Sequence, residues 1–428
     1  MAGAAGCRVA MGSRVSGQRG KTLDQGTAAT DVISAVPVFR VAPPANTMSR
    51  IFWDRIHWRN SLFLMGSLLL VVTALPAYLW YNGLGWFQAG LFVTFFAATG
   101  LSITVGYHRL FSHLAFKTRW PVRSFTLLFG AAAFENSALC WASDHRRHHK
   151  FVDDAHDPYD ITRGFFHAHM GWMLFKLGPD APLDNVPDLV QDRLVRWQHR
   201  FYLPLAVTMG FGLPALLGWL WGGGRGALGG FLVAGVARTV MVQQMTFCIN
   251  SLCHTIGRQP YSSRCTARDS WLLALFTFGE GYHNFHHEFQ HDYRNGVKAW
   301  QFDPSKWCIW SLHRVGLAHR LRRTPPEKVL LAEVSEQERR LAAQLGPECR
   351  LPQAIRAHLE AAGRRRREAA RNWERRWAEY SAAAERRVDA SCERLAEAER
   401  HLREAAAHLR ATIEHWYDAH QLAQTALA

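Results

Sequence analysis

The sequence contains no Cys-x-x-Cys pair. Its eight cysteines are scattered along the chain, at positions 7, 140, 248, 253, 265, 308, 349 and 392. This spacing excludes a c-type haem attachment site and a metal cluster held by grouped thiolates. It also argues against a disulfide framework and indicates reduced thiols in a cytosolic or membrane setting.

Charge is almost absent from four long stretches of the chain. Three of them have no charged residue and the last has only Arg238; they span residues 61–81, 85–107, 201–224 and 226–250. At about 1.5 Å per residue, each could cross a bilayer core of about 30 Å as a helix. The connectors are short, namely residues 82–84 and the residues around Arg225. We therefore expect an all-α integral membrane protein with four transmembrane helices in two hairpins, which excludes a simple soluble enzyme.

The basic residues predict how these helices are oriented. The first connector has no Lys or Arg and the second has one, whereas residues 108–200 carry 12. The positive-inside rule places both termini and the regions 108–200 and 251–325 in the cytoplasm. The net charge is +15, and residues 1–325 supply 14 of it. A basic face beside apolar segments favours a membrane surface or an anionic substrate such as a phosphate ester over nucleic acid.

Composition divides the chain into three parts. Residues 1–47 show no periodicity and no signal-peptide pattern, so two interpretations stay open: a disordered tail, or translation that starts at Met48. Residues 48–325 hold the apolar stretches. Residues 326–428 are densely charged, with Trp, Tyr and Leu at three- and four-residue steps, which predicts an amphipathic helical extension, either a coiled coil or a helical hairpin. We expect this extension to be dispensable for chemistry; self-association and partner docking are its two candidate roles.

Histidines form four patterned groups among the 22 in the chain. His-x-x-His-His occurs at 145–149 and again at 283–287, His108 and His113 follow the second apolar stretch, and His254 comes four residues after Asn250. On a helix, residues three and four apart share a face. His108 and His113 would lie about 140° apart on an ideal helix, so we expect a bend or a helix end between them.

Nine imidazoles and one amide suffice for two metal ions. Neutral imidazole suits iron, zinc, copper and nickel, and the lack of nearby thiolates argues against a structural zinc site. All four groups lie at the cytoplasmic ends of apolar stretches or in cytoplasmic segments, so they can converge. The sequence therefore predicts a dimetal site in a cytoplasmic helical cap. Glu280 is expected to support a ligand rather than to bind metal itself.

These motifs resemble those of a known family. His-Arg-Leu-Phe-Ser-His, Asp-His-Arg-Arg-His-His, Asn-Ser-Leu-Cys-His and Gly-Glu-Gly-Tyr-His-Asn-Phe-His-His occur here in that order. With the apolar stretches, they are similar to membrane acyl-CoA desaturases of the stearoyl-CoA type, over roughly residues 56–317. The resemblance implies a di-iron centre that uses O2 to place a cis double bond, usually Δ9, in a fatty acyl-CoA.

The resemblance also implies roles for individual residues. The implied iron ligands are His108, His113, His145, His148, His149, His254, His283, His286 and His287, with Asn250 reaching one iron through water. The implied substrate contacts are Asn60, Asn136, Trp141, Asp144 and Thr246, and Phe96 and Gly100 match positions that gate the depth of the acyl tunnel. Ser143 and Phe247 depart from the animal pattern of Arg and Trp, which bears on how the head group is recognised.

Other functions were weighed against this one. An acyl-lipid desaturase or a hydroxylase of the same superfamily would use the same motifs. A non-catalytic membrane metal carrier would be expected to place ligands at mid-membrane, whereas these histidines lie at or beyond the ends of the apolar stretches. Because no haem or iron–sulfur motif is present, the two electrons must come from an external donor of the ferredoxin, rubredoxin or cytochrome b type.

Overall fold

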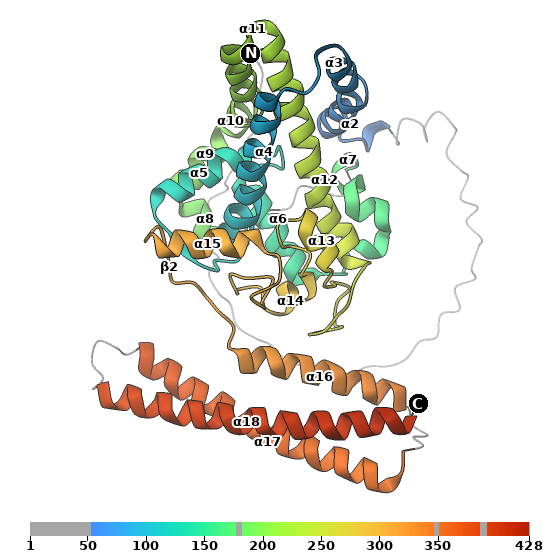
Figure 1. Cartoon of the computed structure of the whole chain (residues 1–428), viewed down its shortest axis with the longest axis vertical. Coiled ribbons are helices and arrows are strands. Elements are labelled where there is room, and N and C mark those ends of the chain that lie inside the picture. The colour runs from blue at the N-terminus through green and yellow to red at the C-terminus, as the bar shows by residue number, and fades with distance from the viewer. Residues whose placement is uncertain (1–52, 177–181, 346–350, 386–391, 428) are drawn as a thin grey trace, which may run out of the picture. The chain divides into compact units, whose positions relative to one another are not determined.

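The structure is a computed structural model that describes residues 53–176, 182–345, 351–385 and 392–427. The tail expected at residues 1–47 lies outside the described residues. The described residues lie in one compact unit, Phe52–Ala428, and most of them are helical (Figure 1). The only strands among the described residues are β1 (Lys117–Thr118) and β2 (Ala318–His319), which pair antiparallel. The expectation of an all-α protein is therefore met, apart from this short ladder.

Three helices of the described residues are long and apolar enough to cross a membrane, whereas the sequence predicted four. The first joins α2 (Trp58–Val72) to α3 (Ala74–Asn82), and the second joins α4 (Trp86–Leu101) to η1 (Ser102–Ser112). The third runs from Tyr202 to His254 through α10 (Tyr202–Val207), η4 (Thr208–Gly212), α11 (Leu213–Gly229), η5 (Gly230–Ala237), α12 (Arg238–Ser251) and η6 (Leu252–His254).

The third helix is folded back on itself, which explains the difference in number. Gly222 and Gly223 leave helical geometry inside α11, and Gly223 has a φ of 60°, a conformation that glycine adopts easily. Beyond this break the backbones of Gly218 and Gly226 pack so closely that a β-carbon on either would overlap the other. The reversal therefore falls just before Arg225, and its two limbs occupy the stretches expected as separate spans. That each limb crosses the membrane remains a prediction.

Shorter helices pack around these long ones. They are α5 (Trp120–Ala131), α6 (Ala138–Phe151), η2 (Ile161–Arg163), η3 (His167–Gly171), α7 (Trp172–Leu174), α8 (Pro187–Gln191), α9 (Arg193–Arg200), α13 (Trp271–Phe276), α14 (His283–Glu288) and α15 (Pro304–Arg314). Their buried apolar side chains, among them Leu127, Val195 and Ile309, form one core with Tyr107 and Phe111 of η1. This core holds η1, which carries the first of the histidines predicted as ligands, in place.

Arg238 is fully buried within the apolar helices. Its guanidinium donates hydrogen bonds to the carbonyl oxygens of Ala132 at 2.7 Å, Gly210 at 2.8 Å and Ala234 at 3.0 Å. A buried cation whose donors meet backbone carbonyls is a structural cross-link between helices. Arg238 thus cross-links three backbone segments inside the helical bundle.

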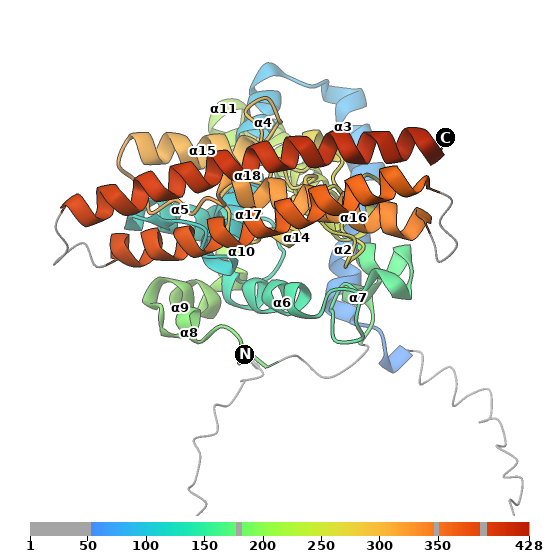
Figure 2. The same ribbon diagram turned by 90° about the horizontal axis from the view of Figure 1, so that it is seen from below.

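The extension beyond residue 325 consists of α16 (Pro326–Leu345), α17 (Gln353–Glu385) and α18 (Cys392–Leu427). In both views α17 and α18 lie side by side along their length (Figure 2). Trp373 of α17 and Leu409, Ile413 and Trp416 of α18 share a buried cluster with Val334 of α16. This arrangement matches the helical hairpin that the sequence left open beside a coiled coil.

Helix α16 also contacts the segment that carries the third histidine motif. Val329 is buried in a cluster with Tyr261, Phe285 and Phe289, and Phe285 belongs to α14. Seven residues further along α16, Glu336 accepts hydrogen bonds from the backbone N–H and the hydroxyl of Ser263. The first helix of the extension is therefore not separate from the segment around α14.

Candidate metal centre

The pair His108 and His113 is brought together by an unusual helical geometry. η1 is a π-helix, in which hydrogen bonds join residues five apart, and the N–H of His113 donates to the carbonyl of His108 at 3.1 Å. The two rings consequently stand 4.7 Å apart between centroids. The predicted helix end is confirmed, because η1 ends at Ser112 and His113 follows it; in addition, the last turn is wider than that of an α-helix.

The two His-x-x-His-His motifs each lie on a short helix, α6 or α14. Helix α6 begins where Ser137 accepts a hydrogen bond from the N–H of Cys140 as an N-cap. The three histidines of each motif share one side of their helix, as predicted, but they do not serve one site. His148 is directed to a different cluster from its neighbours on α6, and so is His286 on α14.

Nine histidines form two adjoining clusters whose ring nitrogens converge. The first holds His108, His113, His145, His149 and His286, and the second holds His148, His254, His283 and His287. These are the nine ligands that the sequence pattern pointed to, and within each cluster the possible ligand atoms all lie within 4.8 Å of one another.

The spacing within the clusters fits metal coordination. In the first cluster, Nε2 atoms approach to 2.8 Å between His113 and His145 and to 2.9 Å between His108 and His286. In the second, Nε2 of His283 lies 3.2 Å from that of His254 and 3.0 Å from that of His287. With metal–nitrogen bonds of about 2.1 Å, neighbouring ligands in an octahedral arrangement stand about 3 Å apart. The donor set therefore fits two metal ions held by imidazole.

Burial keeps these imidazoles neutral. It is the largest cause that lowers the pKa of His145, His149, His283, His286 and His287 well below the usual range, and repulsion between neighbouring histidines adds to it. The same two causes lower the pKa of His113. A neutral imidazole has a free lone pair, which is the form that binds metal.

In the rings of His148 and His254, the Nδ1 atom lies within hydrogen-bonding distance of an oxygen atom. Nδ1 of His148 lies 2.9 Å from both carboxylate oxygens of Asp157. Nδ1 of His254 lies 2.8 Å from Oγ1 of Thr266, whose hydroxyl donates to Asp153 at 2.6 Å. Such partners fix the tautomer and orient Nε2 toward the metal. No role was assigned to Asp153, Asp157 or Thr266 from the sequence.

A buried ionic network supports the first cluster. Glu280 places Oε2 at 3.0 Å from Nδ1 of His108, while its Oε1 accepts from Arg109 at 2.8 Å and Oε2 from Asn295 at 2.6 Å. Arg109 also pairs with Asp303 at 3.0 Å. Burial alone would raise the pKa of Glu280, but His108 and Arg109 outweigh it and lower that pKa. The carboxylate is therefore ionised, and Glu280 supports a ligand as the sequence suggested.

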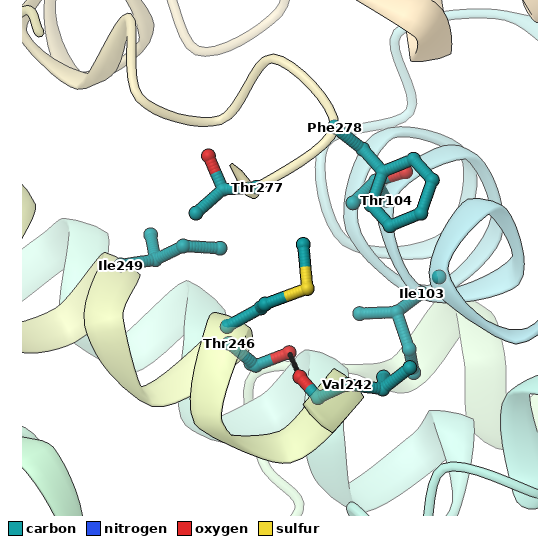
Figure 3. Close-up of a pocket in the computed structure, with 9 residues that line it drawn as sticks. Ile103, Thr104, Val242, Thr246, Ile249, Thr277 and Phe278 are labelled. Atoms are coloured by element: carbon teal, nitrogen blue, oxygen red, sulfur yellow. Dashed lines mark hydrogen bonds between the residues drawn. The ribbon is translucent and has the colours of Figure 1, made fainter. Parts of the chain in front are cut away.

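A narrow cavity lies among the segments that lead to the clusters (Figure 3). Its lining comes from the end of α4 and the start of η1, from α12, and from the turn after α13; the residues are Gly100, Ile103, Thr104, Val242, Met245, Thr246, Ile249, Thr277 and Phe278. The lining is mostly apolar. Thr104 precedes His108 by one turn, Ile249 precedes Asn250, and Phe278 precedes His283 by five residues, so each wall continues into a ligand segment.

The predicted substrate residues are distributed unevenly around this cavity. Gly100 and Thr246 line it, whereas Phe96 does not and instead packs against Phe278 with ring centroids 5.3 Å apart. Trp141 on α6 stacks on His145, 4.8 Å between centroids, so it stands next to the first cluster.

The other predicted contacts are not among the residues that line the cavity. Asn60 on α2 donates a hydrogen bond to the carbonyl of Met173 at 3.3 Å. Asn136 lies just before α6, and its Oδ1 accepts a hydrogen bond from the N–H of Ser137 at 2.8 Å. Asp144 lies on α6 beside the second histidine motif. Asn250 lies on α12. The roles of these four residues toward substrate or metal stay predictions.

Ser143 and Phe247, the two departures from the animal pattern, are both buried. Ser143 is buried and its hydroxyl donates to Oδ1 of Asn185 at 2.7 Å. Phe247 is buried with Leu64 and Leu174 in a separate apolar cluster. Neither side chain contributes a charge, so a phosphorylated head group would need other basic residues on this face.

Long apolar helices and two adjoining imidazole clusters are the features of a membrane protein with a His-rich metal site. The family model described as fatty acid desaturase matches residues 84–303, a range that includes all nine clustered histidines. The chain belongs to the fatty acid desaturase family.

Curated relatives agree with this assignment. The chain is 40% identical over 297 residues to acyl-CoA desaturase 1 of Saccharomyces cerevisiae, which covers 68% of this chain and 57% of the relative. It is 38% identical over 290 residues to a probable acyl-CoA desaturase of Schizosaccharomyces pombe, covering 67% of this chain and 59% of the relative. Human stearoyl-CoA desaturase is 36% identical over 283 residues, which is 64% of this chain and 76% of the human protein. The chain thus spans less than two thirds of the length of the two yeast relatives.

Proposed function

We propose that the protein is a di-iron, O2-dependent desaturase that introduces a cis double bond at the Δ9 position of a saturated fatty acyl-CoA. One observation carries this proposal. Each of the three segments that line the apolar cavity continues into a segment that bears clustered histidines. Family membership supports it, as do relatives that are named acyl-CoA and stearoyl-CoA desaturases.

The first cluster would hold one iron and the second the other, with Asn250 reaching the second through a water molecule. Bound iron would supply the activation of O2 that removal of hydrogen from an unactivated methylene requires. Imidazole ligation suits this chemistry because it offers fixed nitrogen donors and no oxidisable sulfur. Asp157 and Glu280 would hold the rings of His148 and His108 in the ligating orientation.

The reaction is balanced as follows. Two neighbouring methylenes of the acyl chain each lose one hydrogen, and the two carbons form the double bond. O2 takes up these two hydrogens, two electrons from the donor and two protons from water, and becomes two water molecules. The protein must therefore bind a saturated chain, admit O2 and accept electrons from outside.

The chain's own residues would position the substrate. The cavity beside Thr246 and Gly100 would hold the apolar chain, and Trp141 would stand between the chain and the first cluster. Asn60, Asn136 and Asp144 would contact the polar part of the acyl-CoA. We place the clusters, the two termini and the basic region 108–200 in the cytoplasm, where soluble acyl-CoA can reach them.

The electron donor would be a separate protein of the ferredoxin, rubredoxin or cytochrome b type. Neither metal-binding cluster of the described residues contains a cysteine, so iron–sulfur chemistry has no place there. The hairpin of α17 and α18 would serve self-association or docking.

The test is a reaction with purified, iron-loaded protein, a saturated acyl-CoA, O2 and a reductant. The proposal predicts a cis alkene as the CoA thioester. An alcohol would assign the protein to the hydroxylases of the superfamily, and an alkene formed only on intact lipid would assign it to the acyl-lipid desaturases. Absence of any oxidised product from iron-loaded protein with a working reductant would contradict all three.

A further inference from the structure

Phe278 forms one wall of the cavity, and its ring stands opposite α12 in Figure 3. It belongs to the turn that joins α13 to α14, five residues before His283. This turn lies outside the membrane-length helices, whereas the residues expected to gate the cavity, Phe96 and Gly100, both lie on α4.

The ring of Phe278 fills the space next to Gly100. A β-carbon on Gly100 would overlap three carbons of that ring, so only glycine fits at position 100 while an aromatic side chain occupies position 278. The resemblance implied that Gly100, like Phe96, gates the depth of the acyl tunnel, and a glycine there would leave room for the chain. The structure shows that Phe278 takes this room instead, with Phe96 packed behind it and outside the cavity lining.

The backbone directs the ring into this place. Phe278 has a φ of 53°, in the left-handed region that an aromatic residue seldom adopts. Its carbonyl accepts a hydrogen bond from Oγ of Ser305 at 2.9 Å, and Ser305 in turn pairs with Oγ1 of Thr104 at 2.6 Å. Both hydroxyls are buried, so this hydrogen-bonded chain holds the turn against the start of η1.

We propose that Phe278 and Gly100 act as one complementary pair that ends the acyl cavity and thereby sets the length of chain the enzyme accepts. The inference rests on the proposed function. Phe278 meets the terminal part of the acyl chain directly, and Phe96 acts through Phe278 by supporting its ring. The specificity of the enzyme is thus shared between a membrane helix and the turn that leads to the third histidine motif.

The experiment compares Phe278→Val, Gly100→Ala and the double variant against a series of saturated acyl-CoAs of increasing length. Phe278→Val removes the wall, so the preferred substrate should lengthen by about two methylene groups. Gly100→Ala alone pushes against the ring and should disfavour long chains by about 10-fold or more. In the double variant the smaller side chain at 278 leaves room for the added methyl, so Gly100→Ala should have little effect there and the profile should stay close to that of Phe278→Val.

Matched control variants distinguish an effect on chain length from a general loss of structure. Phe276→Val alters the same segment, but Phe276 is 55% exposed and should leave the profile unchanged. Phe96→Ala should lengthen the preferred chain in the wild type and add little in the Phe278→Val background. Iron content, measured for every variant, reports whether the nearby ligands remain in place.

The outcomes are distinguishable. If wild-type protein yields no alkene, the proposed function fails. If the wild type makes alkene and Phe278→Val retains iron but keeps the wild-type length profile, the desaturase assignment stands and the role of Phe278 is refuted. Additive effects of the two substitutions would likewise refute the pairing of Phe278 with Gly100.

Discussion

Nδ1 of His108 lies 3.0 Å from Oε2 of Glu280, so a buried carboxylate faces the side of the ring opposite the converging Nε2 atoms. The carboxylate is itself fixed by Arg109 and Asn295. Because all of these groups are buried, the rings of the first cluster are already oriented before metal binds. The entropy lost in ordering them is therefore lost on folding and not on metal binding.

Replacing Glu280 should therefore weaken the first metal site. Glu280→Gln keeps the size of the side chain but removes the charge that orients His108, and we expect metal affinity to fall by about 10- to 100-fold. Competition with a chelator, followed by metal analysis, measures this. Glu288→Gln is the control, since Glu288 lies on α14 but pairs with the exposed Arg264. Equal metal retention in both variants would refute the orienting role.

The sequence predicted which histidines come together better than how they are divided between the two clusters. Histidines at steps of three and four had to share a helix face, and this local geometry holds on α6 and α14. Which cluster each ring joins depends on how α6, α14 and η1 pack together, and spacing along one helix does not contain that information. The helix end predicted between His108 and His113 is present at Ser112, but the π-helical geometry before it was not predicted, because an ideal α-helix was the reference.

The same limit applies to contacts between distant segments. Hydropathy identified the apolar stretches and a connector around Arg225, and the chain does leave helical geometry just before it, at Gly222 and Gly223. It did not identify the close packing of Gly218 on Gly226, which depends on how the two limbs meet. Periodicity predicted the helices of the extension. It did not predict that Val329 would pack on Phe285, since such a contact joins two residues far apart in the sequence.

This contact changes what we expect of truncations. Ending the chain after Leu345 keeps α16 and its contacts with Ser263 and Phe285, so turnover and bound iron should remain. Ending it before Pro326 exposes Tyr261 and Phe289, and losing the burial of Val329 and its neighbours should cost about 2 kcal/mol or more of stability. Thermal unfolding and iron analysis of both forms decide this; identical behaviour would show that all of residues 326–428 are dispensable.

Stability should depend on pH through Glu135. Burial raises the pKa of Glu135 to about 8, and Thr246 and Trp141 offset this only in part, since neither meets the geometry of a hydrogen bond to its carboxylate oxygens. The unfolded chain releases this proton near pH 4.5, so stability falls as pH rises from there to about 8, by at most about 1.4 kcal/mol per pH unit.

Glu135→Gln removes that proton linkage. The variant should gain stability over the wild type as pH rises from 6 toward 8, and the gap should stop growing above the folded-state pKa of about 8. Thermal unfolding in detergent at several pH values measures the difference. A gap that stays constant with pH would mean that Glu135 is already ionised in the folded protein.

Chain length should respond to α4 as well as to the turn at Phe278. Gly100→Leu places a large side chain against the ring of Phe278, so the enzyme should accept only shorter acyl chains. Phe96→Ala removes the support behind that ring and should admit longer chains. Assays with a series of saturated acyl-CoAs measure both effects, and unchanged profiles in both variants would exclude α4 from length selection.

The central claim is that the two histidine clusters carry out fatty acyl desaturation. The most direct measurement is gas chromatography, with location of double bonds, on lipids from cells that lack their own desaturase and express this protein. The account predicts cis Δ9 monounsaturated chains with the wild type and none with His148→Ala or His286→Ala, one ligand from each cluster. Monounsaturated chains at wild-type levels in either variant, or none with well-expressed, iron-loaded wild type, would contradict it.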